Sequence, residues 1–340
     1  RAMGAAPDFT FVDGDRLIRF GEGVRGEAGA LLEQRGFSGY ALLSTPRARG
    51  AAPELAESAQ VVADVPEGRV DEVSAAVRGQ VGGHPIVALG GGRVIDAAKA
   101  IAGADGLACA AVPTTLSGAP FTPFHRMPAG ADTGHLVRPS LVVADTGLMA
   151  SQPMPGLAGS AMNSLAHAVE ALYGPLANPV AGMAALRSAS AFALALHPES
   201  PDRPALAYAS FLGGYAVGTT GFAIHHAACQ TIVRELGTPH AETNAVMLPR
   251  TVAFMADRAP TEISLLAMAL GDSGGDPGAA AGLVGSLAAL AGPESLSDLG
   301  VEEGALPALA QRIAAHPATG NTPPSPPTED DVLALLRSAL

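Results

Sequence analysis

The chain has 340 residues, a net charge of -12 and a charged fraction of 15%. This acidic balance excludes nucleic acid as the expected partner, because binding to a phosphate backbone requires clustered Lys and Arg. Hydrophobic residues make up 48% of the chain, and the length suffices for two domains.

The first part of the chain alternates predicted strands and helices. Strands are expected at 10–12, 16–20, 40–44, 60–65, 85–89, 108–112 and 141–144. Helices are expected at 27–34 and 70–81, and an Ala-rich helix follows residue 92. This alternation is typical of βαβ units, so we predict a parallel, Rossmann-like sheet.

The second part is predicted to be helical throughout. Helices are expected at 159–173, 179–196, 203–219, 224–236, 244–257, 260–270, 277–291, 305–315 and 332–340. We therefore predict an α/β dinucleotide-binding domain over 1–152 and an all-α catalytic domain over 153–340, joined in the turn at 151–156.

Neither a leader nor a membrane span is indicated, and the two distant cysteines predict no disulfide framework, so a cytoplasmic protein is expected.

Gly90, Gly91 and Gly92 follow an apolar strand and precede the helix that holds Asp96 and Lys99, the only lysine of the chain. Glycines let the backbone approach an anion closely, and a helix start presents free N–H groups and a positive dipole end. The pattern predicts a phosphate-binding turn, although an ordinary strand–helix connection with a surface lysine has the same pattern.

Two further polar turns follow strands of the same predicted sheet. They contain Ser44 and Thr45, and Thr114, Thr115 and Ser117. Ligands of parallel sheets bind at the carboxyl ends of the strands, so these turns are expected near the glycines.

The helical part contains a group of histidines. Asn163 and His167 are one turn apart on one helix face, His225 and His226 begin another helix, and His240 lies in a predicted polar turn. Such a set could hold a four-coordinate metal ion. Histidines that cap helices or lie in the core would give the same pattern.

Together these motifs resemble the iron-containing alcohol dehydrogenase superfamily. The resemblance is carried by Gly-Gly-Gly-x-x-x-Asp-x-x-Lys-Ala at 90–100, Pro-Thr-Thr-x-Ser-Gly at 113–118 and the helix at 160–172. The segments at 43–46, 162–173, 225–226 and 239–249 are similar to one branch, the maleylacetate reductases. The resemblance implies the dehydroquinate synthase-like fold of that superfamily, with its active site in a cleft between the two domains.

The implied activity is hydride transfer from NADH or NADPH to an enone acid, giving 3-oxoadipate in aromatic compound metabolism. The implied partners are an anionic small-molecule substrate and a second copy in a homodimer, with no nucleic acid and no membrane. By position, the metal ligands of the superfamily fall on Asn163, His167, His226 and His240. Asn163 replaces the carboxylate, which lowers metal affinity, so we expect no metal. Three histidines can still hold zinc, and a metal-dependent alcohol dehydrogenase stays an alternative.

The resemblance also implies residue roles. The expected cofactor-binding residues are Gly90, Gly91, Gly92, Asp96, Lys99, Thr114, Thr115, Ser117, Ser44 and Thr45. The expected catalytic residues are His167, His226, His240 and Asn163, and the expected substrate-binding residues are Arg250 and His225. Departures from the branch at Arg93, Leu116, Ala119, Pro120, Gln230 and Asn244 leave a diverged, non-redox enzyme as a further alternative.

Overall fold

The computed structural model describes residues 7–340, which form two compact units. The first unit ends at Ser151 and also includes Arg203–Ala207, and the second comprises Gln152–Asp202 and Tyr208–Leu340. Among the helices of residues 7–340, none is both long and apolar enough to cross a membrane.

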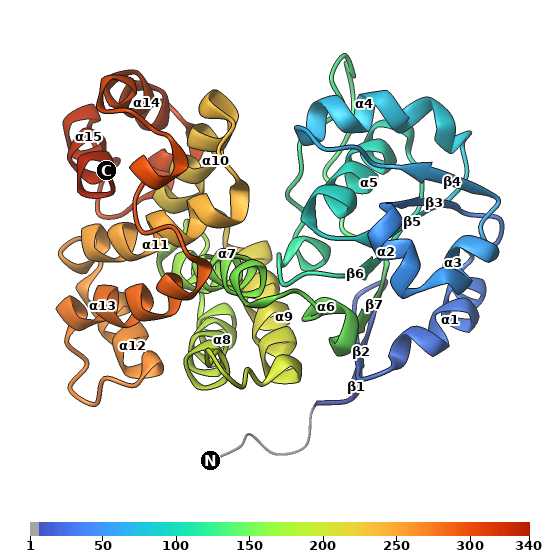
Figure 1. The fold of residues 1–340 in the computed structure, drawn as a ribbon, viewed down its shortest axis with the longest axis horizontal. Helices are drawn as coiled ribbons and strands as arrows, with labels where there is room; N and C mark the ends of the chain where they lie inside the picture. Colours follow the sequence, from blue (N-terminus) through green and yellow to red (C-terminus); the bar gives the residue numbers. More distant parts are fainter. Residues whose placement is uncertain (1–6) are drawn as a thin grey trace. The chain divides into compact units, whose positions relative to one another are not determined.

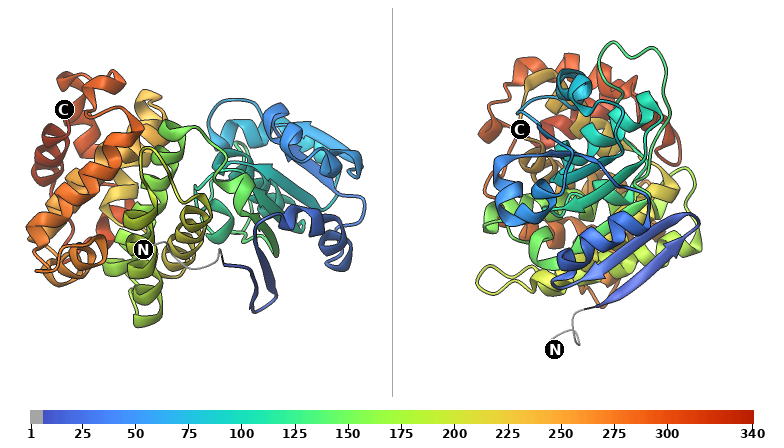
Figure 2. Two further views of the ribbon diagram at one scale, coloured as in Figure 1. Left: turned by 60° about the horizontal axis from the view of Figure 1, so that its bottom comes forward. Right: turned by 90° about the vertical axis from the view of Figure 1, so that its right-hand side faces the viewer.

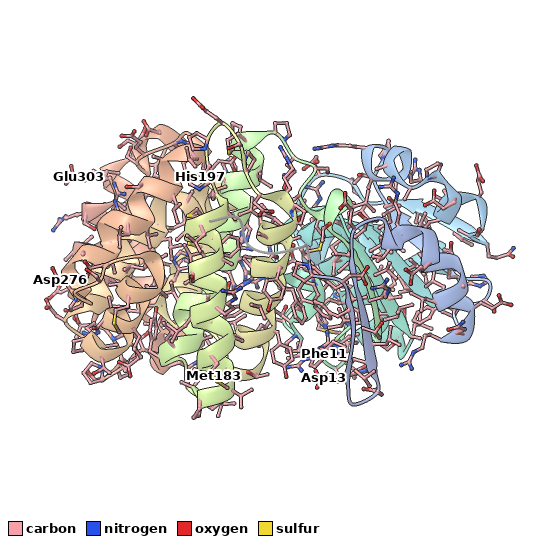
Figure 3. The ribbon with its side chains drawn as sticks, turned by 90° about the horizontal axis from the view of Figure 1, so that it is seen from below. Phe11, Asp13, Met183, His197, Asp276 and Glu303 are labelled. Atoms are coloured by element: carbon pink, nitrogen blue, oxygen red, sulfur yellow. The ribbon has the colours of Figure 1, made fainter. Side chains whose placement is uncertain are left out.

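A seven-stranded sheet in the order β1-β2-β7-β6-β5-β3-β4 is the centre of the first unit (Figure 1). Its strands are β1 (Phe9–Asp13), β2 (Arg16–Gly21), β3 (Ala41–Ser44), β4 (Val61–Asp64), β5 (Ile86–Gly90), β6 (Cys109–Pro113) and β7 (Leu141–Asp145). All neighbours are parallel except β1 and β2, which form a hairpin at one edge of the sheet (Figure 2). Phe11 and Asp13 lie on this hairpin (Figure 3). All seven strands predicted from the sequence are confirmed.

Helices cover both faces of the sheet. They are η1 (Val24–Glu27), α1 (Ala28–Gln34), α2 (Pro46–Ala51), α3 (Pro53–Glu57), α4 (Val70–Val81), α5 (Gly92–Asp105), η2 (Ala119–Phe121) and α6 (Thr146–Met149). Helices α4 and α5 pack on one face through Val73, Val77 and Ile101, while α1 to α3 pack on the other through Leu32 and Leu55. The short helices α2, α3 and α6 were not predicted.

The second unit consists of helices, and only the first residues of α9, Arg203–Ala207, belong to the first unit. The helices are α7 (Met154–Tyr173), α8 (Pro179–Ala195), α9 (Arg203–Thr220), α10 (Ile224–Leu236), α11 (His240–Ala256), α12 (Pro260–Leu270), α13 (Pro277–Ala288), η3 (Ala289–Ala291), η4 (Ser297–Leu299), η5 (Glu303–Ala305), α14 (Leu306–Ala314), η6 (Pro317–Asn321) and α15 (Glu329–Ser338). Met183 is on α8, with its side chain largely exposed (Figure 3). The prediction of a polar turn at His240 was wrong, because Pro239 precedes the helix as its N-cap and His240 is the first residue of α11.

Candidate functional site

The glycine turn between β5 and α5 is closely packed in the first unit. A Cβ atom on Gly90 would lie 2.7 Å from the Cβ of Val94, and one on Gly91 would lie 2.9 Å from Cγ2 of Thr115. A Cβ atom on Gly92 would lie 3.1 Å from the Cβ of Ser117. The structure therefore brings the glycines together with the turn that contains Thr115 and Ser117, as predicted, and leaves almost no room for side chains at 90–92.

The amino end of α5 has no side-chain cap. Gly91 is the N-cap residue, and it has no side chain to accept the N–H groups of the first helical turn. Such N–H groups and the helix dipole favour an anion. Thr114 continues the turn, with its N–H donating to the carbonyl of Gly90 at 2.9 Å. This arrangement fits a phosphate group.

Lys99 is fully buried, and its amino group is held by the chain itself. Nζ donates to Oδ1 of Asp96 at 2.8 Å, to the carbonyl of Phe124 at 2.6 Å and to the carbonyl of Ala119 at 3.1 Å. These contacts tie the segment after the 113–118 turn to α5. Because its three protons are already donated within the chain, Lys99 has none left for a cofactor phosphate, and Asp96 serves as its ion-pair partner.

The hydroxyls of Ser44 and Thr45 have structural partners. Ser44 is buried, and its Oγ donates to the carbonyl of Leu89 at 2.8 Å, which links β3 to β5. Oγ1 of Thr45 accepts the N–H of Ala48 at 3.3 Å and caps α2. These bonds hold the carboxyl end of β3 beside the strand that leads into the glycine turn, and they occupy both hydroxyls.

A buried carboxylate organises the histidines of the second unit. Oε2 of Glu170, on α7, lies 2.6 Å from Nδ1 of His226. Its Oε1 accepts the N–H groups of His225 at 2.8 Å and of His226 at 3.2 Å, in the first turn of α10. Glu170 is fully buried and was not among the residues predicted. A signal was present, because an acidic residue at i+3 shares the helix face of His167.

Glu170 fixes one nitrogen of His226 and leaves the other without a partner. Among residues 7–340, nothing forms a hydrogen bond with Nε2 of His226, although this atom is buried. The His226 ring stacks on Phe222, with centroids 4.1 Å apart, and on His167, with centroids 4.8 Å apart. The structure thus brings His167 and His226 together as predicted.

Burial dominates the electrostatics of this cluster. It raises the pKa of Glu170 to about 7, while the N–H bonds from α10 favour the ionised carboxylate. Burial lowers the pKa of His226 to about 3, with a smaller contribution from His240. A neutral His226 that donates from Nδ1 to Glu170 has a lone pair at Nε2.

His225 and Arg250, the predicted substrate-binding residues, already have partners. His225 is buried, and its ring nitrogens lie 3.0 Å from Oγ1 of Thr251 and 2.9 Å from Oδ1 of Asn244. Burial lowers the pKa of His225 to about 4. Arg250 donates to the carbonyl of Glu294 at 3.0 Å and to the carbonyl of Ser338 at 3.5 Å. His225 therefore supports the cluster from inside the core, and Arg250 holds the chain near the carboxyl terminus.

Asn163 and His240 differ in their surroundings. Asn163 is buried on α7, one turn before His167, and His240 is exposed at the start of α11. Nε2 of His240 is 3.4 Å from Nδ2 of Asn244. Within residues 7–340, no three or more His, Cys, Asp and Glu side chains are grouped in a way that could hold a metal ion.

Comparisons with known families match both parts of the chain. Residues 16–146 match the model described as iron-containing alcohol dehydrogenase. Residues 157–340 match the model described as Fe-containing alcohol dehydrogenase family, C-terminal.

Individual proteins of this family that are similar to the chain include maleylacetate reductases. The chain is 32% identical to maleylacetate reductase from Rhizobium sp. (strain MTP-10005), over 97% of each chain. It is 38% identical to maleylacetate reductase 1 from Rhodococcus opacus over 64% of this chain, a match that spans 62% of the length of that protein. The crystal structure of the Rhizobium enzyme has a TM-score of 0.82 at 31% identity, covering 99% of both chains.

Proposed function

This chain belongs to the iron-containing alcohol dehydrogenase family and is an NAD(P)H-dependent reductase, and we propose that it reduces an enone acid such as maleylacetate without a metal ion. The observation that carries this proposal is His226, held at Nδ1 by Glu170 and without a partner at Nε2. Such a nitrogen can exchange a proton with a substrate oxygen.

Residues of the first unit would hold the cofactor. Gly90, Gly91 and Gly92 would let its pyrophosphate approach the backbone, and the uncapped N–H groups of α5 would bind the phosphate oxygens. Thr114, Thr115 and Ser117 line the adjoining turn. A cofactor bound there would supply a hydride, and its addition to the enone would leave negative charge on the carbonyl oxygen.

Residues of the second unit would neutralise that negative charge by donating a proton. When Glu170 is protonated, as its pKa of about 7 allows, it would donate to Nδ1 of His226, and the neutral ring would carry its own proton on Nε2. Nε2 would donate that proton to the substrate oxygen while Nδ1 takes the proton of Glu170, which also fixes the orientation of the ring. His167 and Phe222 pack against the ring and exclude water from it. His240, exposed beside this cluster, is the residue that we propose meets a substrate carboxylate.

The side chains at the positions of the metal ligands support a metal-free reaction. Asn163 offers a neutral amide, and the carboxylate of Glu170 is already bound by two backbone N–H groups and His226. A dication would therefore be held by neutral ligands, without the charge compensation that hard cations require. A zinc-dependent alcohol dehydrogenase is the second candidate, because metal-binding histidines also donate their other ring nitrogen to a carboxylate.

Activity with and without chelator tests both candidates. We expect the purified chain to oxidise NADH or NADPH when maleylacetate is added, and dialysis against a chelator to leave the rate unchanged. The decrease in cofactor absorbance gives the rate. Loss of activity on chelation and its return with zinc would favour the second candidate. Cofactor binding without turnover of any enone acid would contradict the proposed substrate.

The substitution Gly91→Ala should weaken NADH binding by about tenfold. The added Cβ would lie 2.9 Å from Cγ2 of Thr115, so the neighbouring turn must move away from the phosphate site. Fluorescence titration with NADH gives the Kd. Gly79→Ala on α4 is the control, since its Cβ would meet nothing within 4 Å and no change in Kd is expected. Equal affinities of the two variants would mean that the turn does not touch the cofactor.

A further inference from the structure

Arg93 follows the glycine turn directly, as the second residue of α5, and it forms an ion pair with Glu67. Nη2 donates to Oε1 of Glu67 at 2.6 Å, and Nη1 donates to the other carboxylate oxygen. The carboxylate belongs to the segment between β4 and α4, within the same unit. The guanidinium is thus held beside the start of the helix proposed to bind phosphate.

Breaking the ion pair between Arg93 and Glu67 requires little free energy. The Glu67 side chain is 88% exposed, and an ion pair with one partner in water contributes little net free energy. The Nε atom of Arg93 is buried and has no hydrogen-bond partner among residues 7–340. The guanidinium therefore has an unused donor and a weakly held partner.

A phosphate is a better partner for this guanidinium than Glu67. It presents two oxygens to the planar fork, as a carboxylate does, and it binds at the same time to the uncapped N–H groups of α5. Side chains of a helix tilt toward its amino end, which directs Arg93 toward an anion bound there.

We propose that Arg93 exchanges Glu67 for the pyrophosphate of the cofactor, so that Arg93 binds phosphate and Glu67 competes with it. This inference rests on the proposed cofactor site. It assigns opposite effects to the two partners of one ion pair. Removing the guanidinium weakens cofactor binding, and removing the negative charge of Glu67 strengthens it.

The test is titration of the full chain with NADH, NADPH and ADP. Because the chain has no tryptophan, NADH emission reports binding without overlap from indole. We expect Arg93→Ala to raise the Kd of all three ligands by about tenfold, and Glu67→Gln to lower it by about threefold. The control is Arg78→Ala, which breaks the ion pair with Asp105 at the other end of α5 and should change none of the Kd values.

The possible failures are distinguishable. If the unaltered chain binds neither NADH nor ADP, the proposed cofactor site itself is wrong. If it binds them and Arg93→Ala behaves like Arg78→Ala, the exchange is overturned while the cofactor site stands. A loss confined to NADPH would also overturn it, because the contact would then be to the ribose phosphate. Should Arg93→Ala fold poorly, an unchanged Kd in Glu67→Gln would contradict the exchange.

Discussion

Replacing Glu170 by Gln should lower kcat by about 100-fold while leaving the Kd of NADH unchanged. Gln keeps the shape of the side chain and an oxygen for the N–H groups of His225 and His226. Its amide nitrogen, however, would face Nδ1 of His226, which now shares a hydrogen bond of 2.6 Å with the carboxyl group, and an amide cannot transfer a proton to the ring. The ring would change tautomer, and a protonated ring would lose its counter-charge. Steady-state kinetics and cofactor titration measure the two quantities separately.

A double substitution tests whether Glu170 acts through His226. If it does, His226→Gln alone and the pair Glu170→Gln with His226→Gln should reduce kcat by similar factors, because the second change removes nothing further. If the factor by which kcat falls in the double variant equals the product of the two single factors, Glu170 contributes independently of His226. A Glu170→Gln variant with the kcat of the unaltered chain would remove Glu170 from the mechanism.

The substitution Lys99→Met should destabilise the first unit by about 3 kcal/mol. Met fills most of the space of the lysine stem but donates no hydrogen bond. The carbonyls of Ala119 and Phe124 and the carboxylate of Asp96 would lose their shared donor in a buried site. Urea unfolding followed by far-ultraviolet circular dichroism gives the change in free energy.

An ion pair near the surface, between Arg78 of α4 and Asp105 at the end of α5, provides the comparison for Lys99. Arg78→Met removes the contact with Asp105, whose side chain is 31% exposed, and should cost less than about 1 kcal/mol. Equal costs for Lys99→Met and Arg78→Met would mean that water replaces the lost ammonium group.

Most of the fold could be predicted from the sequence because its elements are long and regular. The apolar runs before residues 44, 90 and 113 are confirmed as β3, β5 and β6, and the helices at 70–81, 224–236 and 260–270 have the predicted bounds. Helices α2 and α3 were missed because they are only six and five residues long. The Thr45-Pro46 pair, read only as the end of a strand, is also a helix start, with Thr45 as N-cap and Pro46 after it.

The candidate site was less predictable because its key contact is distant in sequence. Glu170 and His226 are 56 residues apart, and only the packing of α7 against α10 brings them together. Local patterns identified the histidines but not the carboxylate that orients one of them. Conversely, Lys99 lies in a motif typical of cofactor sites, yet tertiary contacts with Ala119 and Phe124 occupy its amino group.

The burial of Lys99 also affects the chemical reactivity of the native chain. No other lysine is present, and this one is fully enclosed. Acetylation, ubiquitin-type conjugation and amine-directed cross-linking therefore have no lysine to attack on the folded surface. Covalent labelling of this side chain requires α5 to separate from the segment around residue 124, so the labelling rate would report transient opening of that region.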